Sequence, residues 1–409
     1  MFFGRVLGPL LTGSASRNKV RLLFGARQTG KTALLRHLLA GETTYVVNLQ
    51  DSGDRRRYEA DPAAFGRVVK GLPARIKTIV VDEIQKVPAL LDEVQALYDA
   101  APRRWQWFLT GSSARRLRRG TANLLPGRSH AYHLHPVCGW EVEPDGPDRR
   151  CIPEPAAPLS APPFRRQSLA RVLSFGSLPG VRTESAASAR RTLAAYVDHY
   201  LEEEIRREAL VRDMGPFLVF LRLAASEAGR QINLARLASE SGVAASTLKT
   251  YYQVLVDTFV GHWMPAYARR PRQRLLTTPR FHFFDLGVRN VAADLALDGR
   301  VPDAIGGPLL EQWVGQELIA RAGYLGRGHG VSFWRTKSGA EVDFVWGTPR
   351  EDVPIEVKWS TRPRVADARH VEAFLDLYPD RARHGLVVCR CQHVEQLTKR
   401  VRAVPWSML

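Results

Sequence analysis

The chain has 409 residues, 45% of them hydrophobic, and 59 Lys and Arg against 41 Asp and Glu give a formal net charge of +18. This length and composition exclude a disordered chain and predict two or three globular domains. No apolar run approaches the roughly 18 residues of a membrane-crossing helix, so no membrane partner is expected. The four cysteines, Cys138, Cys151, Cys389 and Cys391, have no metal-ligand spacing and fit a reducing cytoplasm.

A phosphate-binding loop is predicted near the N-terminus, between an apolar strand at 20–24 and a helix at 33–39. The loop consists of Gly25, Ala26, Arg27, Gln28, Thr29, Gly30, Lys31 and Thr32. In such a loop the glycines let backbone N–H groups point at a phosphate, and the lysine reaches the β- and γ-phosphates. The hydroxyl of Thr32 would be a ligand of Mg²⁺. The sequence therefore predicts a site for ATP and Mg²⁺.

Two further strands end in polar residues that suit this site. The first, at 78–81, is followed by Asp82 and Glu83. Because the carboxyl ends of parallel strands share one edge of a sheet, we expect Asp82 to hold Mg²⁺ and Glu83 to polarise the attacking water. The second strand ends in Ser112 and Ser113, which could sense the γ-phosphate or form an ordinary turn.

The pattern along the chain predicts an α/β protein in four parts. Residues 1–140 alternate strands and helices as a nucleotide-binding domain does. Residues 141–165 are rich in proline, which is typical of a linker or an extended loop. Residues 166–278 have helical spacing, and residues 279–409 return to short strands with flanking helices.

Two features of the middle region suggest nucleic acid as a partner. Residues 234–255 predict two helices joined at Gly242, a helix-turn-helix that we interpret as part of a winged helix. Its second helix would enter the DNA major groove, although Lys249 is its one basic residue, which favours packing between domains instead. Basic clusters at 115–119 and 269–274 would attract DNA or RNA, or are the solvated arginines of an arginine-rich chain.

The C-terminal part contains an acid followed by Glu-x-Lys, which is typical of metal-dependent nucleases. Asp343 is followed by Glu356 and Lys358 on the next predicted strand, and an upstream helix could add Glu311 or Glu317. The carboxylates would bind Mg²⁺, the metal would activate water, and the lysine would stabilise negative charge. A salt-bridged pair of strands with charged outer faces explains the same residues without chemistry.

The order of these motifs resembles that of prokaryotic AAA+-type P-loop ATPases with a C-terminal DUF4143 domain, over nearly the whole chain from about Val20. Beyond the phosphate-binding loop, the resemblance rests on segments 82–86, 109–114, 125–128, 134–136, 200–205, 284–287, 333–335, 341–344 and 355–358. It implies an ATPase core, a winged-helix segment and a nuclease-like PD-(D/E)xK fold. It also makes Arg128 a candidate arginine finger, acting on its own ATP or on that of a neighbouring subunit in a homo-oligomer, unless it forms a salt bridge to the sheet.

We therefore expect a cytoplasmic, ATP-binding and ATP-hydrolysing switch protein that uses Mg²⁺. Its nucleotide state would reposition C-terminal domains that bind nucleic acid. One alternative is a Mg²⁺-dependent nuclease that the ATPase gates. The other is a scaffold whose inactive nuclease-like domain binds a partner.

Overall fold

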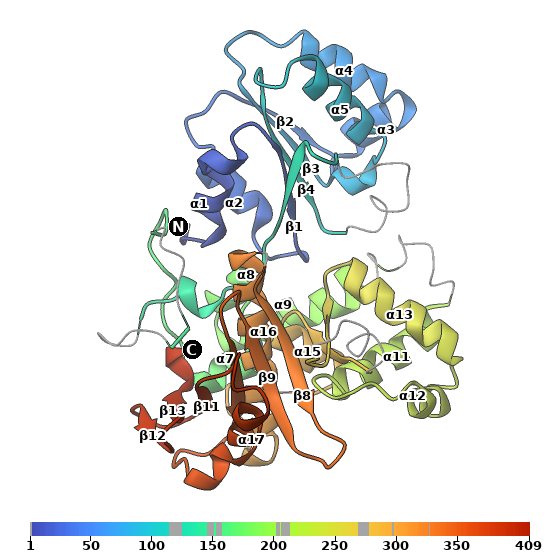
Figure 1. Ribbon diagram of the computed structural model, residues 1–409. Helices are drawn as coiled ribbons and strands as arrows, with labels where there is room; N and C mark the ends of the chain where they lie inside the picture. The colour runs from blue at the N-terminus through green and yellow to red at the C-terminus, as the bar shows by residue number, and fades with distance from the viewer. Residues whose placement is uncertain are drawn as a thin grey trace.

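The computed structural model describes residues 2–113, 125–144, 151–152, 158–201, 205, 213–268, 278–296, 298–326 and 328–409. Figure 1 shows an N-terminal lobe in blue and cyan above a helical region in green and yellow and a C-terminal sheet in orange and red. The basic clusters predicted to attract nucleic acid lie at or within the gaps of the description. Among the described helices, none combines the length and the apolar character that a membrane crossing requires.

The N-terminal lobe is built on a five-stranded parallel sheet with the order β2-β3-β4-β1-β5. Its strands are β1 (Val20–Phe24), β2 (Thr44–Asn48), β3 (Thr78–Asp82), β4 (Gln106–Gly111) and β5 (Ser129–His133). All residues of β1 and β3 are buried, as expected for strands with helices on both faces. The order places β4 between the strand that precedes the phosphate-binding loop and the strand that ends in Asp82.

Helices cover both faces of this sheet. They are α1 (Leu7–Thr12), α2 (Lys31–Leu38), α3 (Ser52–Ala60), α4 (Ala63–Lys70) and α5 (Leu90–Ala100). Leu23 of β1 packs in one core with α1 and α2, whereas its neighbour Leu22 packs in the other core with α3, α4 and α5. The alternation of side chains along a strand produces these two cores from one apolar segment. The predicted α/β fold class is confirmed.

The middle of the chain is helical and contains an antiparallel pair of strands before its last helix. Its helices are α7 (Leu169–Phe175), α8 (Pro179–Arg182), α9 (Ala186–Ala195), a π-helical turn (Tyr196–Leu201), α11 (Met214–Ser226), α12 (Leu234–Ser241), α13 (Ala245–Asp257) and α15 (Leu286–Ala292). Helices α12 and α13 meet at Gly242, which has the left-handed backbone (φ 67°) that glycine adopts most easily. Strands β6 (Gly261–Met264) and β7 (Arg280–Phe283) pair antiparallel. The winged-helix interpretation stays a prediction.

A six-stranded mixed sheet forms the C-terminal part, with the order β12-β13-β11-β10-β9-β8. Its strands are β8 (Gly330–Arg335), β9 (Glu341–Gly347), β10 (Asp352–Val357), β11 (Gly385–Cys389), β12 (Glu395–Gln396) and β13 (Val401–Pro405). The long helix α16 (Asp303–Leu325) packs on one core of the sheet and α17 (Arg369–Leu377) on the other. Figure 1 shows α16 running along the sheet toward the N-terminal lobe.

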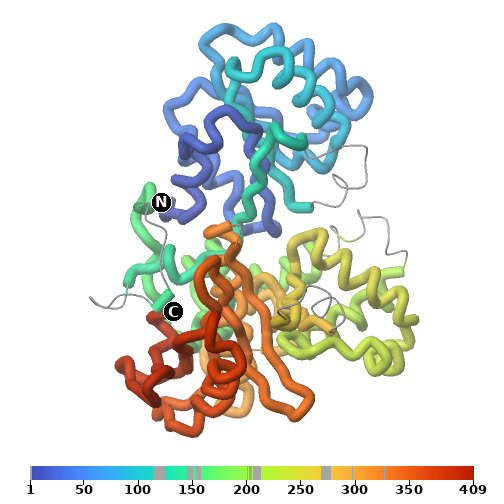
Figure 2. The backbone as a smooth tube through the Cα atoms, viewed as in Figure 1, coloured from blue at the N-terminus to red at the C-terminus, as the bar shows by residue number. Residues whose placement is uncertain are grey.

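Three histidines lie where the N-terminal lobe meets the rest of the chain. Figure 2 shows the chain passing from that lobe down to this junction after β5. The rings of His133 and His135 are stacked at 4.4 Å, and His262 of β6 lies 5.8 Å and 5.7 Å from them. Burial lowers the pKa of His133 to about 3 and that of His262 to about 4. Burial also lowers the pKa of His135 well below its ordinary value, so all three rings are neutral at physiological pH.

Acid should weaken the fold through these histidines. An unfolded histidine has a pKa near 6.5, so below that pH the unfolded chain binds protons that the folded chain does not. The contribution of these histidines to the free energy of unfolding is therefore fully present above about pH 6.5. It is lost as the pH falls toward 4, by roughly 1.4 kcal/mol per pH unit for each histidine. We expect His262→Gln to show a smaller loss of unfolding free energy between pH 7 and pH 5 than the wild type. Equal losses in denaturant titrations of both proteins would contradict this.

Candidate functional site

The loop between β1 and α2 wraps around the side chain of Lys31. The Lys31 Nζ donates hydrogen bonds to the carbonyl oxygens of Gly25 (2.8 Å) and Ala26 (3.0 Å). The Thr29 Oγ1 donates to the same Ala26 carbonyl at 2.9 Å. Lys31 is 6% exposed, so its ammonium group is held inside the loop. These contacts fix the loop in a curled conformation.

Glycine is required at both ends of this curl. The backbone is left-handed at Gly30 (φ 96°), directly before α2, and Gly25 has a φ of 154°. A Cβ at Gly25 would lie 2.4 Å from the carbonyl oxygen of Leu134, so no larger residue fits there. The exposed Gln28 also adopts a left-handed backbone (φ 62°). The loop thus presents the N-terminus of an eight-residue helix, which favours negative charge.

A hydroxyl and a carboxylate lie next to each other where Mg²⁺ was predicted. The Thr32 Oγ1 donates to Asp82 Oδ2 at 3.0 Å, and the Thr110 hydroxyl donates to Asp82 Oδ1. A cavity of about 250 Å³ opens beside this pair and is lined by both residues. Oxygen ligands of this kind suit a small hard cation that keeps several of its waters. Thr32 and Asp82 therefore fit the metal expected with ATP.

Glu83 is held as an ionised carboxylate beside this pair. Its Oε2 accepts hydrogen bonds from Ser112 Oγ (2.8 Å) and from Gln85, and its backbone N–H donates to Thr110 Oγ1 (3.1 Å). Burial raises the pKa of Glu83, but the charge of Lys31 and the hydrogen bonds from Ser112 and Gln85 outweigh it. The pKa consequently lies below its ordinary value. An ionised carboxylate can accept a proton from water at neutral pH.

The structure brings Ser112 to this carboxylate and adds two residues to which the sequence assigned no role. Gln85 Nε2 also donates to Ser112 Oγ at 2.9 Å, so Ser112, Gln85 and Glu83 form a closed set of hydrogen bonds. Thr110, a residue of β4, hydrogen-bonds to both Asp82 and Glu83. Ser113 is fully buried. The sequence could have indicated a role for Thr110, because it is a polar residue directly after three large apolar residues of its strand.

Arg5 supports the loop from outside, and sequence reasoning missed it. It is 2% exposed and donates to the carbonyls of Thr29 (2.7 Å) and His135 (2.6 Å). Its Nε lies 3.0 Å from Glu141 Oε1. Although burial disfavours the charge, Glu141 outweighs that effect and raises the pKa of Arg5. This arginine ties the phosphate-binding loop to the segment that leaves the N-terminal lobe.

The start of α8 also lies against the loop. A Cβ at Gly30 would be 3.7 Å from Pro179 Cγ. The turn before α8 is held by the buried Asp285, whose carboxylate accepts from the backbone N–H groups of Ser177 (2.6 Å) and Val288 (3.1 Å). Asp285 caps α15 in this way. The loop, the turn before α8 and the start of α15 thus follow one another in a series of contacts.

Arg128 lies far from this site in its own chain. It precedes β5, and its carbonyl accepts from Val20 N at the amino end of β1, whereas the loop follows the carboxyl end. Its guanidinium binds both carboxylate oxygens of Asp99, at 2.6 Å and 2.9 Å. In this conformation Arg128 cannot contact a nucleotide on its own loop. The alternative that the sequence left open was a salt bridge to the sheet, whereas the observed partner Asp99 belongs to helix α5.

Removal of Arg128 should therefore have little effect on an isolated subunit. We expect Arg128→Ala to change ATP turnover less than about twofold in dilute protein, because the guanidinium lies at the wrong edge of the sheet. Asp99→Asn is the matched control, since it breaks the ion pair and keeps the arginine. A loss of turnover that grows with protein concentration, in Arg128→Ala only, would show action on a neighbouring subunit.

The C-terminal acids gather as predicted, with one correction. The backbone N–H of Val357 donates to Asp343 Oδ2 at 2.8 Å, and Lys358 Nζ donates to Glu356 Oε1 at 2.6 Å. Burial and then the charge of Asp343 raise the pKa of Glu356 to about 7 and that of Glu311 to about 8. Across the described residues, no group of three or more His, Cys, Asp and Glu side chains is arranged to hold a metal ion.

Glu317 does not belong to this cluster, and its assignment there is wrong. Its Oε2 accepts from the Gly139 N–H (2.8 Å) and from Arg321 (3.0 Å), between the N-terminal lobe and α16. Glu311 is the acid of α16 that reaches Asp343. The reason is helical geometry, because six residues correspond to roughly 240° around the helix axis.

The parallel sheet, the curled loop and the two acids define a P-loop nucleotide-binding domain. Residues 17–143 match the model of an AAA domain family, residues 166–298 match the domain of unknown function DUF8612, and residues 306–409 match DUF4143. The chain thus carries an N-terminal AAA-type P-loop ATPase domain and a C-terminal DUF4143 domain, which confirms the resemblance.

The chain is also similar, at low identity, to other proteins and solved structures. The chain is 23% identical over 389 residues to an uncharacterized protein of Mycobacterium tuberculosis and to one of Mycobacterium bovis, covering 95% of this chain and 80% of each relative. A Walker-type ATPase of Pyrococcus abyssi is 14% identical with a TM-score of 0.47, covering 71% of this chain and 96% of that chain. A signal transduction ATPase with a tetratricopeptide repeat sensor from Pyrococcus horikoshii is 12% identical with a TM-score of 0.21, covering 77% and 45%.

Proposed function

We propose that the protein binds ATP with Mg²⁺, hydrolyses it, and passes its nucleotide state to the C-terminal domains. The observation that carries the proposal is the ionised Glu83 carboxylate, held by Ser112 and Gln85 beside the Thr32–Asp82 pair. The loop and Lys31 would bind the phosphates, and Thr32 and Asp82 would hold the metal. Bound Mg²⁺ supplies positive charge that neutralises the phosphate oxygens.

Glu83 would act as the general base. A water between Glu83 and the γ-phosphorus attacks that phosphorus, and the bond to the β–γ bridging oxygen breaks. The proton of the water passes to the carboxylate, and ADP and phosphate are formed. Lys31 would stabilise the charge that develops on the γ-phosphate oxygens. Ser112 would fix the direction of the carboxylate through its 2.8 Å hydrogen bond.

Contacts of the phosphate-binding loop with its surroundings could pass a change in nucleotide state to the helical region. Arg5 hydrogen-bonds to Thr29, and Gly30 lies against Pro179. The loop is therefore linked, through Arg5, to the segment that leaves the N-terminal lobe, and it also lies next to α8. Asp285 joins the turn before α8 to α15. Phosphates drawn into the loop would compete with Gly25 and Ala26 for the Lys31 ammonium group and change the shape of the loop. We propose that this change repositions the helical region.

We further propose that the C-terminal domains engage DNA or RNA, that subunits associate, and that the protein works in the cytoplasm, where thiols such as its four free cysteines stay reduced. The test is Mg²⁺-dependent ATP turnover with and without DNA, in the wild type and in Glu83→Gln. Turnover that DNA stimulates, and that the variant lacks, supports the ATP switch and its partner. Turnover indifferent to DNA would contradict the nucleic-acid part and favour a protein partner.

A second function, a metal-dependent nuclease, is favoured by one observation. The charge of Asp343 raises the pKa of both Glu356 and Glu311, and Glu356 also raises that of Glu311, so the three acids lie near one another. A bound Mg²⁺ would offset this repulsion between carboxylates. Arg280, however, already binds Glu311 at 3.1 Å, which suits a structural ion pair or an inactive scaffold. We expect any Mg²⁺-dependent nicking of DNA to disappear in Asp343→Asn and to persist in Asp376→Asn, an acid of α17. Absence of nicking by the wild type would exclude this function.

A further inference from the structure

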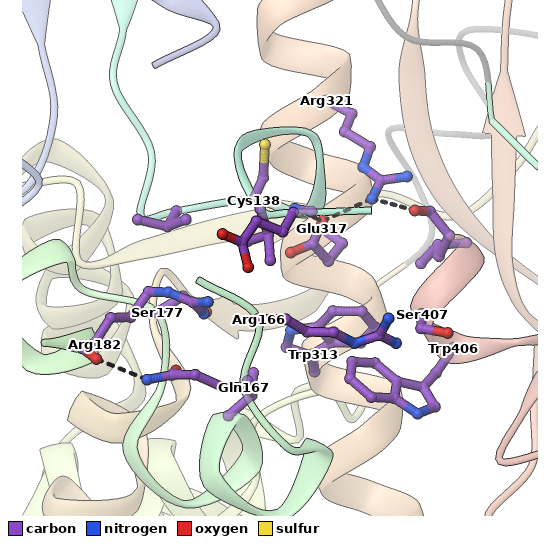
Figure 3. Close-up of a pocket in the computed structure, with 16 residues that line it drawn as sticks. Cys138, Arg166, Gln167, Ser177, Arg182, Trp313, Glu317, Arg321, Trp406 and Ser407 are labelled. Carbon is purple, nitrogen blue, oxygen red and sulfur yellow. Dashed lines mark hydrogen bonds and ion pairs between the residues drawn. The ribbon is translucent and has the colours of Figure 1, made fainter. Parts of the chain in front are cut away.

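A small cavity lies between the segment that leaves the N-terminal lobe, α7 and α8, α16 and the turn at Trp406–Met408. Figure 3 shows that Arg166, Arg182 and Arg321 reach it from three different elements. No residue of the phosphate-binding loop lines the cavity. It is therefore separate from the site that the proposed function uses.

Arg182 is buried here without a counter-ion. It is 8% exposed, and its Nη2 donates to the carbonyl oxygen of Arg165 at 2.9 Å. Its Nε is buried and has no hydrogen-bond partner. Across the part of the chain that the structure describes, no carboxylate lies within 4.0 Å of its guanidinium. Burial lowers the pKa of Arg182 to about 10, against the opposing pull of the more distant Glu317, so the group is still charged at neutral pH.

Arg321 adds further donors on the other side of the cavity. It is fully buried, and its Nη2 donates to Glu317 Oε2 (3.0 Å) and to the backbone oxygen of Leu409 (2.6 Å). Its Nε and Nη1 are buried and have no partner among the described residues. The same Glu317 oxygen also accepts from the Gly139 N–H. The two guanidinium groups thus leave three buried nitrogen atoms without an acceptor among the described residues, although the side chains of Glu143 and Glu317 also line the cavity.

An unsatisfied buried cation is costly, so this imbalance points to a ligand that carries acceptors and negative charge. The cavity has a volume of about 50 Å³. A single water needs roughly 10–15 Å³ on the same measure, so the space holds a few heavy atoms, fewer than a nucleotide or a peptide contains. Donors from three elements suit a tetrahedral anion better than a planar carboxylate, which two parallel donors satisfy. We propose that this cavity binds inorganic phosphate or an equally small oxyanion.

The test must separate this cavity from the phosphate-binding loop. Inorganic phosphate is titrated calorimetrically into the full chain carrying Lys31→Ala, which disables the loop. The proposal expects saturable binding at one site per chain. Adding Arg182→Gln should weaken that binding at least tenfold, whereas adding Arg190→Gln, an exposed arginine of α9, should leave it unchanged.

Two outcomes would overturn the proposal. One is the absence of phosphate binding in the Lys31→Ala protein, and the other is equal binding by Arg182→Gln. If Arg182→Gln does not fold, Arg166→Gln on the more open side of the cavity replaces it, with the same expectation. Acetate is titrated in parallel, and acetate that binds as tightly as phosphate would contradict the tetrahedral ligand. Loss of ATP hydrolysis in Glu83→Gln is measured separately, so failure of the proposed function and failure of this site are distinguishable.

Discussion

Replacing Lys31 by alanine should weaken ATP binding about 100-fold or more. The Lys31 ammonium is buried inside the loop, where the phosphates of ATP are proposed to bind. A hydrogen bond to a charged group contributes about 1.5–3 kcal/mol, and contacts to two phosphates would together exceed the roughly 2.8 kcal/mol that correspond to a 100-fold change. The measurement is the Kd of a fluorescent ATP analogue in the presence of Mg²⁺.

The fold should survive this replacement. Alanine removes the charge that helps to keep the buried Glu83 ionised, but Glu83 retains its hydrogen bonds from Ser112 and Gln85. The loop retains the hydrogen bond from Thr29 to Ala26. We therefore expect Lys31→Ala to unfold within a few degrees of the wild type. Lys70→Ala, at an exposed position of α4, is the matched control and should bind ATP normally. Tight binding that persists in a folded Lys31→Ala protein would refute the nucleotide site itself.

The parts of the site that the sequence predicts are those formed by neighbours along the chain. Apolar strands ending in Gly25, Asp82 and Ser112 must deliver these residues to one edge of a parallel sheet, because every such strand points the same way. The structure places Ser112 on Glu83 accordingly. Local pattern was sufficient for these residues because the spacing from strand to loop to helix determines the geometry.

The residues that the sequence missed, assigned wrongly or left open depend on long-range geometry. Arg128 stands in a Gly-Arg pair, yet whether a residue lies at the amino or the carboxyl end of a neighbouring strand follows from strand register. Glu317 and Glu311 differ only in their angle around α16, which depends on how that helix packs. Arg5 reaches Thr29 across 24 residues and Glu141 across 136, and no spacing in the sequence indicates these contacts. Such residues support the site through tertiary contacts.

Replacing Glu83 by glutamine should separate binding from chemistry. Glutamine keeps the size of the side chain and an oxygen that can accept from Ser112, so the loop and the Thr32–Asp82 pair should be unaffected. The variant loses the base that accepts the proton from water. We expect kcat to fall by about 10²–10⁴, the usual contribution of a general base, with the Kd for ATP nearly unchanged. Glu59→Gln, at an exposed position of α3, should behave as the wild type.

The pH profile adds a second test of the same role. Because the pKa of Glu83 lies below its ordinary value, its carboxylate is ionised between pH 6 and pH 8. Turnover should therefore show no loss attributable to this group as the pH falls from 8 to 6. A base poised near neutrality would instead lose activity in that interval. If Glu83→Gln retained turnover within tenfold of the wild type, the set of hydrogen bonds around Glu83 would be structural, and the attacking water would have to be activated by another group.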